Sequence, residues 1–167
     1  MGREIRRVPK GWEHPRGKNG FFLSLYDQTF DDAARAWWHA AVQWHNGTMR
    51  EESERQQREK YPWYWQWDGP PPDEKYYRPA FTSPADCYQI YETVSEGTPV
   101  SPVFESVEAM LAWMTQPIDR ALEYNTGEDW QSMQGMTREQ AERFCGRGSS
   151  VSMIFSPGTG MVAGHRL

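Results

Sequence analysis

Histidine and cysteine are the residue types in this sequence that could carry metal-binding or nucleophilic chemistry, and neither falls in a recognised spacing. The histidines are His14, His39, His45 and His165. His39 and His45 are six residues apart, so on one helix their side chains project about 120° from alignment and cannot chelate one metal ion together. The sequence contains no HExxH, CxxC or two-His-one-carboxylate spacing. It therefore predicts no metal and no cofactor.

The two cysteines, Cys87 and Cys145, lie far apart in the chain. We expect two buried free thiols in a reducing compartment, with a single disulfide as the alternative. Cys145 falls on the apolar face of an expected helix, which favours packing over reactivity. Pairing either thiol with a histidine as nucleophile and base would be arbitrary. Without a catalytic motif we leave enzymatic activity uncertain and favour a protein that is not an enzyme.

Three glycines near the end of the chain, Gly158, Gly160 and Gly164, suggest a glycine-rich loop. A phosphate-binding loop needs a helix N-terminus directly after it. No helix follows these glycines, so the spacing favours a tight hairpin turn.

Tryptophan is the unusual feature of the composition, with nine in 167 residues and 14% aromatic residues overall. Trp63, Trp65 and Trp67 alternate, so in an extended chain they would share one face. One interpretation is a strand whose tryptophan face covers the core. The other is an aromatic platform or interface wedge, since tryptophan is a common hot-spot residue. The neighbouring charges sum to about −1, which favours a protein over a nucleic acid as the partner. We select these three tryptophans as candidate partner-binding residues.

Charge is unevenly distributed along the chain, whose formal net charge is −5. The first eighteen residues carry six Lys and Arg against two Glu, so the remainder of the chain is at −9. We select Arg6 and Arg7 as electrostatic partner contacts, on an N-terminal basic arm (1–20) of an acidic single domain (1–167). The alternative is that these arginines only solvate a strand. Direct binding to duplex DNA is disfavoured by the acidic body, whereas docking to a basic protein groove stays open.

The clearest expected helix starts at Phe30, capped by Thr29 with Asp32 at the capping-box spacing, and stops at Asn46-Gly47. We place its tryptophans, Trp37, Trp38 and Trp44, mostly in the core. Residues 48–60 contain almost nothing apolar and indicate an exposed helix or a mobile link.

Further elements follow from periodicity and caps. Ser106 caps a second helix, with Val107, Met110, Leu111 and Met114 on its apolar face. Thr137 and Gln140 form a capping box for a third helix, with Met136 and Ala141 at the staple positions and an end at Gly146. Strands are expected at residues 3–8, 21–26, 88–94, 151–155 and 161–163. The pattern predicts an α+β fold, a single compact domain with a few helices packed on a small, mostly antiparallel sheet.

Four segments together resemble a widespread group of small proteins encoded by phages and prophages, a group of unknown function. They are REIRRVPKGWEHP near the start, YYRPAF in the middle, then YQIYETVSEGTPVSPVFES and MTREQAERF. The resemblance extends from Arg3 to about Phe155, with a divergent stretch near residues 118–134. It implies no catalytic residue.

This resemblance, the acidic charge and the excess tryptophan lead to three functional hypotheses. The first is an inhibitor of a host defence system, of the anti-CRISPR type. It would bind a host defence effector protein through acidic and aromatic surfaces, in the cytoplasm of the infected bacterial host. The second is a sponge for a nucleotide or other small ligand, or an enzyme acting on a nucleotide signal, and the third is a structural virion protein. Homo-oligomers fit all three. No apolar stretch approaches the roughly 18 residues that span a membrane, and the N-terminal sequence is not that of a secretory signal.

Overall fold

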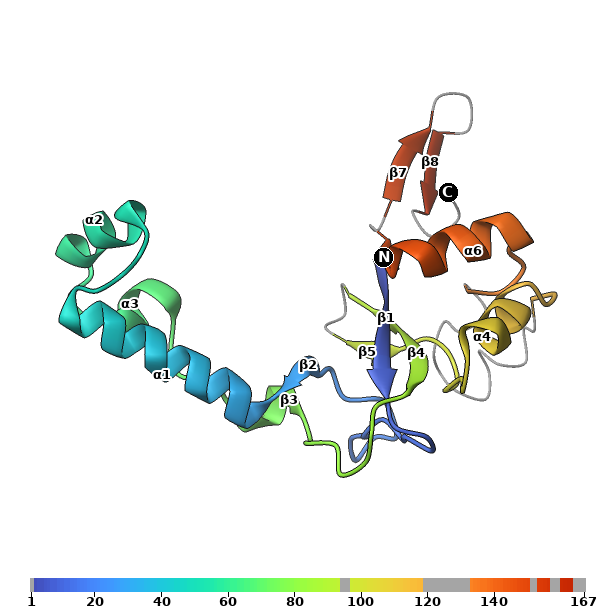
Figure 1. Cartoon of the computed structure of the whole chain (residues 1–167), viewed down its shortest axis with the longest axis horizontal. Helices are drawn as coiled ribbons and strands as arrows, with labels where there is room; N and C mark the ends of the chain where they lie inside the picture. Colours follow the sequence, from blue (N-terminus) through green and yellow to red (C-terminus); the bar gives the residue numbers. More distant parts are fainter. Residues whose placement is uncertain (1, 94–96, 119–132, 151–152, 157–159, 164–167) are drawn as a thin grey trace. The chain divides into compact units, whose positions relative to one another are not determined.

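The computed structural model describes residues 2–93, 97–118, 133–150, 153–156 and 160–163. Its chain divides into two units (Figure 1). Residues 1–25 and 81–167 form one of them, called the sheet unit here, and residues 26–80 form the other, called the tryptophan unit. The predicted α+β class, with helices and a mostly antiparallel sheet, is confirmed.

The sheet unit is built on four antiparallel strands in the order β5-β4-β1-β6. They are β1 (Arg3–Val8), β4 (Cys87–Glu92), β5 (Thr98–Pro99) and β6 (Ser149–Ser150). The predicted strand at 3–8 is confirmed, and the predicted strand at 88–94 is confirmed as β4, which ends at Glu92. In the central pair, register runs from Arg3 opposite Glu92 to Val8 opposite Cys87. The segment predicted as a basic arm thus contributes a central strand.

Two capped helices, α4 (Val107–Met114) and α6 (Arg138–Arg147), lie side by side in the sheet unit (Figure 1). Ser106 accepts a hydrogen bond from the Ala109 backbone N–H, and Thr137 forms the predicted capping box. The predicted end of α6 at Gly146 is wrong. Gly146 continues the helix, and Gly148 ends it because that glycine takes the left-handed conformation (φ 73°).

The core of the sheet unit lies between these helices and the sheet. Its buried side chains are Ile90, Val100, Phe104, Met110, Leu111, Met114, Met133, Met136, Ala141 and Phe144. Val107, which we expected on the apolar face of α4, is 38% exposed instead and is the first residue of the helix. A smaller cluster contains Val8, Cys87 and Tyr91.

The last strands, β7 (Met153–Ser156) and β8 (Gly160–Ala163), pair antiparallel. This confirms the predicted C-terminal hairpin. Gly158 and Gly164 lie outside the described residues, while Gly160 begins β8.

The tryptophan unit starts with β2 (Tyr26–Thr29), which pairs in parallel with β3 (Tyr77–Arg78).

The predicted strand at 21–26, most of which falls in the sheet unit, is wrong. Phe22 makes only an isolated bridge to Arg16, and the Arg16 guanidinium lies 3.6 Å from the Phe22 ring centroid. Around this bridge the Gly17 backbone N–H donates to the Phe21 carbonyl oxygen and the Leu23 backbone N–H to the Pro15 carbonyl oxygen, which closes a tight loop in place of a strand.

Three helices form the body of this unit: α1 (Phe30–Asn46), α2 (Glu52–Lys60) and α3 (Tyr64–Asp68). A 3-10 turn, η1 (Glu74–Tyr76), precedes β3. The predicted caps of α1 are confirmed: Thr29 accepts from the Asp32 backbone N–H at 3.2 Å, and Gly47 is left-handed at φ 70°. Of the two interpretations of residues 48–60, the exposed helix is confirmed, since α2 buries no side chain.

Candidate functional site

The segment with alternating tryptophans is helical, so the prediction of an extended strand with one tryptophan face is wrong. Trp63 is the N-cap of α3, and its backbone N–H donates to Gln66 Oε1 at 3.1 Å. On a helix Trp65 and Trp67 project roughly 200° apart. Gly69, with φ 98°, ends the single turn. The N-terminal cap at Trp63 and the helix end at Gly69 therefore determine the local structure, and the two-residue alternation of tryptophan does not.

Trp44 of α1 is the buried centre of the tryptophan unit, with 1% of its surface exposed. Its ring stacks on Trp67, with centroids 6.1 Å apart and planes at 14°. Its indole N–H donates to the Tyr61 carbonyl oxygen at 2.9 Å. These contacts hold the 61–67 segment against one face of α1.

Trp37, two turns earlier on α1, extends the same contact. Its ring lies 5.4 Å from that of Tyr64, edge to face, and its indole N–H donates to the Gly69 carbonyl oxygen at 3.3 Å. Burial, followed by a hydrogen bond with Asp68, raises the pKa of Tyr64 to about 12. The Tyr64 hydroxyl therefore stays neutral at physiological pH and gives the surface no charge.

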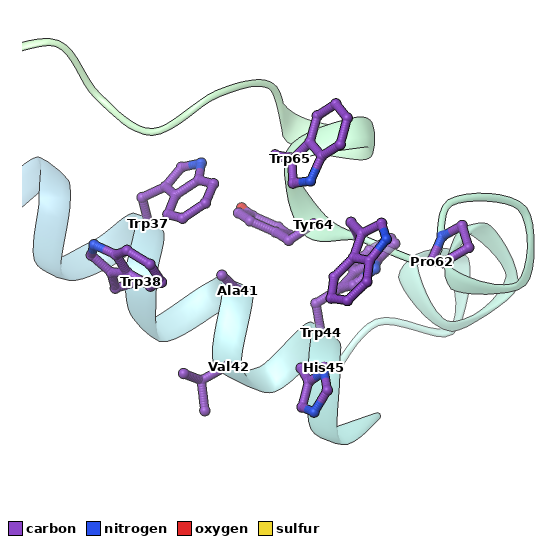
Figure 2. Close-up of a pocket in the computed structure, with 10 residues that line it drawn as sticks. Trp37, Trp38, Ala41, Val42, Trp44, His45, Pro62, Tyr64 and Trp65 are labelled. Carbon is purple, nitrogen blue, oxygen red and sulfur yellow. The ribbon is translucent and has the colours of Figure 1, made fainter.

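An apolar groove of about 360 Å³ lies between α1 and the 62–65 segment (Figure 2). Figure 2 shows Trp37 directed toward Tyr64, whereas Val42 and His45 point away from α3. The lining residues are Trp37, Trp38, Ala41, Val42, Trp44, His45, Pro62, Trp63, Tyr64 and Trp65. A groove with this lining can bury apolar side chains but offers few polar groups for orienting a reacting substrate.

Of the three predicted tryptophans, Trp63 and Trp65 line this groove, whereas Trp67 stacks on Trp44 and is not part of the lining. Trp63, Trp65 and Trp67 are 57%, 54% and 44% exposed. Their exposure is what a binding residue requires, since a large apolar ring gains most when a partner covers it. Their role in binding stays a prediction.

Trp38 is a surface residue that sequence reasoning missed. The prediction that the α1 tryptophans are mostly core holds for Trp44 and is wrong for Trp38, which is 60% exposed. The signal was present in the spacing. Trp38 directly follows Trp37, so the two rings point about 100° apart and cannot both face α3.

The predicted electrostatic contacts, Arg6 and Arg7, are engaged within the sheet unit. Arg6 donates to Glu4 at 2.6 Å and to the Leu25 carbonyl oxygen at 3.0 Å, and its guanidinium lies over the Tyr91 ring. Arg7 is exposed but covers the Tyr88 ring at 4.4 Å. Both arginines therefore have structural partners.

A second cavity, of about 590 Å³, belongs to the sheet unit. Its lining includes buried His14, whose Nε2 lies 2.7 Å from the Leu23 carbonyl oxygen and whose Nδ1 lies 3.2 Å from the Tyr91 hydroxyl. Burial lowers the pKa of His14, and the nearby charges of Arg6 and Arg16 lower it further. With both ring nitrogens engaged, His14 is positioned as a structural group rather than as a base.

The cysteines carry no sign of nucleophilic activation. Both are free, as predicted; Cys87 is buried and Cys145 is only half-buried. Burial raises the pKa of Cys145 to about 11 and also raises that of Cys87. Across the described ranges, no group of three or more His, Cys, Asp or Glu is arranged to hold a metal ion. In the part of the chain that the structure describes, no helix combines the length and apolar character needed to cross a membrane.

Comparisons with protein-family models, with curated proteins and with solved structures found no match to this chain.

Proposed function

We propose that this protein is a phage-encoded inhibitor of a host defence system, of the anti-CRISPR type. It acts in the cytoplasm of the infected bacterial host by binding a defence effector protein. The binding surface is the exposed aromatic surface of the tryptophan unit, centred on Trp63, Trp65 and Trp67.

The observation that carries this proposal is the concentration of exposed tryptophan on one small unit. Four tryptophans of the unit are more than 40% exposed, beside an apolar groove. Exposed apolar patches of this kind mark interaction sites, and tryptophan is enriched among residues that dominate binding energy. A unit that needed these rings only for its own core would bury them, as it does Trp44.

Charge supports a protein partner with a basic surface. The tryptophan unit has ten Asp and Glu against seven Lys and Arg, a formal charge of −3. Acidic groups around an apolar centre favour docking to a basic groove, including one that normally holds nucleic acid. They oppose direct binding of a phosphate backbone.

A nucleotide sponge is less favoured, because it would pair exposed arginines for phosphate with tryptophans for the base. Arg6 is already bound by Glu4 and by a backbone carbonyl. The tryptophan groove itself is lined by apolar side chains and one histidine. A thermal-shift panel of nucleotides tests this alternative, since a micromolar ligand at millimolar concentration stabilises by roughly 4 kcal/mol.

The proposal is tested by expressing the protein in bacteria that carry single defined defence systems and challenging them with a sensitive phage. We expect plaque counts to recover on at least one defended strain, and the purified effector of that system to form a complex that salt weakens. Protection on none of the strains would overturn the proposal. Detection of the protein in purified phage particles would support the virion alternative instead.

A further inference from the structure

Four exposed residues form a stripe along α1, on a face about 100° around the helix from Trp37, which contacts α3. Three of them, Trp38, Val42 and His45, also line the edge of the apolar groove. Asp31, Trp38 and His45 are spaced seven apart, so each lies about 20° from the next around the helix, and Val42 lies about 40° from Trp38. All four are exposed. In Figure 2, Val42 and His45 point away from Tyr64. These four residues are called the α1 stripe.

The α1 stripe is self-complementary about its centre. Asp31 and His45 are each seven residues, two turns, from Trp38. A two-fold axis through Trp38 therefore places Asp31 of one helix opposite His45 of an antiparallel copy. The same register sets Val42 opposite Ala34, an apolar pair flanking the central tryptophans.

The charges at the two ends of α1 favour this antiparallel arrangement. The first turn carries Asp31 and Asp32, while at the other end Arg58 donates to the His45 carbonyl oxygen at 2.7 Å. Within the described ranges, neither the Asp31 carboxylate nor the His45 imidazole makes a hydrogen bond or ion pair. An imidazole N–H can donate to a carboxylate in either protonation state. Antiparallel pairing also sets the helix dipoles in opposition, which is favourable.

We infer that the α1 stripe is a self-association surface, on which a second copy of this chain docks as an antiparallel helix with Trp38 at the two-fold axis. The occupant is a second copy of this chain because Asp31 at one end of the stripe is complementary to His45 at the other end. This inference goes beyond the proposed function, which is centred on Trp63, Trp65 and Trp67; Trp38 borders the groove beside them and is the residue that the two surfaces share.

The first test measures molar mass by light scattering across a wide concentration range. The wild type is expected to reach the dimer mass. Val42→Glu places two carboxylates in the apolar centre and should raise the dimer dissociation constant at least about tenfold. The matched control is Ala36→Glu, an exposed position about 160° around α1 from Trp38, which should leave the dimer intact. A wild type that is monomeric at every concentration, or a dimer unaffected by Val42→Glu, overturns the inference.

The second test addresses register by disulfide formation, in a background in which Cys87 and Cys145 are replaced by alanine. Asp31→Cys with His45→Cys should give covalent dimers on mild oxidation. The two positions are about 21 Å apart along one helix, too far for a disulfide within a chain. Ala36→Cys is the control and should run as a monomer in non-reducing denaturing gel electrophoresis. Equal cross-linking at position 36, or none at positions 31 and 45, overturns the antiparallel register.

The self-association surface and the partner surface are separable by mutation. Trp63→Ala with Trp65→Ala should leave the dimer mass unchanged, so loss of protection by that variant concerns the proposed function alone. Conversely, a monomeric wild type that still protects phage would overturn the dimer and leave the inhibitor proposal standing.

Discussion

Trp67 stacks on Trp44 with the two ring planes 14° apart, yet Trp44 is 1% exposed and Trp67 is 44% exposed. One ring holds the tryptophan unit together, and the other covers it while keeping a face open to solvent. The surplus of tryptophan in this sequence thus includes both a structural anchor and exposed rings, which we propose contact a partner. Substitutions at the two kinds of position should have different consequences.

Trp44→Ala should destabilise the tryptophan unit by about 3–5 kcal/mol, because it leaves a cavity and removes the indole donor from the Tyr61 carbonyl. Hydrogen exchange in residues 26–80 measures the loss directly. Trp65→Ala, at an exposed position, should change stability by less than about 0.5 kcal/mol. Equal effects of the two substitutions would contradict the assignment of Trp44 as the centre of this unit.

Glu92→Gln should destabilise the sheet unit by about 3–5 kcal/mol, because it removes the negative charge that lies against the buried Arg3 guanidinium. Arg3 Nη1 and Glu92 Oε1 are 3.1 Å apart across β1 and β4, with side-chain exposures of 2% and 9%. Urea unfolding followed by circular dichroism gives the difference.

The matched control for this pair is Glu105→Gln, which removes an exposed partner of Lys10. We expect a change of less than about 1 kcal/mol there, since solvent screens surface ion pairs. A Glu92→Gln variant as stable as the control would mean that Arg3 and Glu92 are solvated in solution.

The Cys145 thiol should react slowly with disulfide reagents at pH 8, because burial raises its pKa to about 11 and little thiolate is present. The rate should rise with pH until about pH 11, measured in a Cys87→Ala background. The half-buried thiol contributes its full share to the free energy of unfolding below the unfolded-state pKa of about 8.5, and this contribution falls as pH rises toward 11. Rapid labelling at pH 8 that levels off near pH 8.5 would show that Cys145 is solvent-exposed.

His14 should make the protein less stable in mild acid. Burial lowers its pKa in the folded state, so below about pH 6.5 the unfolded chain takes up a proton that the folded chain resists. The stability supplied by neutral His14 is present above that pH and is lost as pH falls through the folded-state pKa. Urea midpoints between pH 7.5 and 5 should fall more steeply for the wild type than for His14→Gln. Equal slopes would exclude this contribution.

Local signals in the sequence predicted the helices well, because their caps are encoded within four residues. Thr29, Ser106 and Thr137 all cap as expected, and the strand at residues 3–8 ends just before Pro9, as its sequence indicates. The errors occur where local geometry competes with periodicity. Trp63, Trp65 and Trp67 alternate like a strand, but a capped turn and the Gly69 stop make them helical.

The candidate surface could be predicted only in part. The tryptophan excess and the alternation at residues 63–67 point to those tryptophans, whereas the position of Trp38 at the border of the apolar helix face predicts burial. Burial depends on which elements cover that face, and α3 covers the side of Trp37 and Trp44. The contacts of Arg6 could not be predicted from the sequence either, because its partners include the Leu25 carbonyl oxygen and the Tyr91 ring, which are distant along the chain.

The most direct test of the inhibitor proposal compares two double variants for protection of a phage on a defended host. Trp63→Ala with Trp65→Ala removes exposed rings of the tryptophan unit, and Phe21→Ala with Leu23→Ala removes exposed apolar groups of the sheet unit as a matched control. Both variants should fold and accumulate like the wild type. We predict that the first loses protection by at least about tenfold in plaque count, and that the control keeps it. Full protection by the tryptophan variant would contradict the proposal that this surface binds the defence effector.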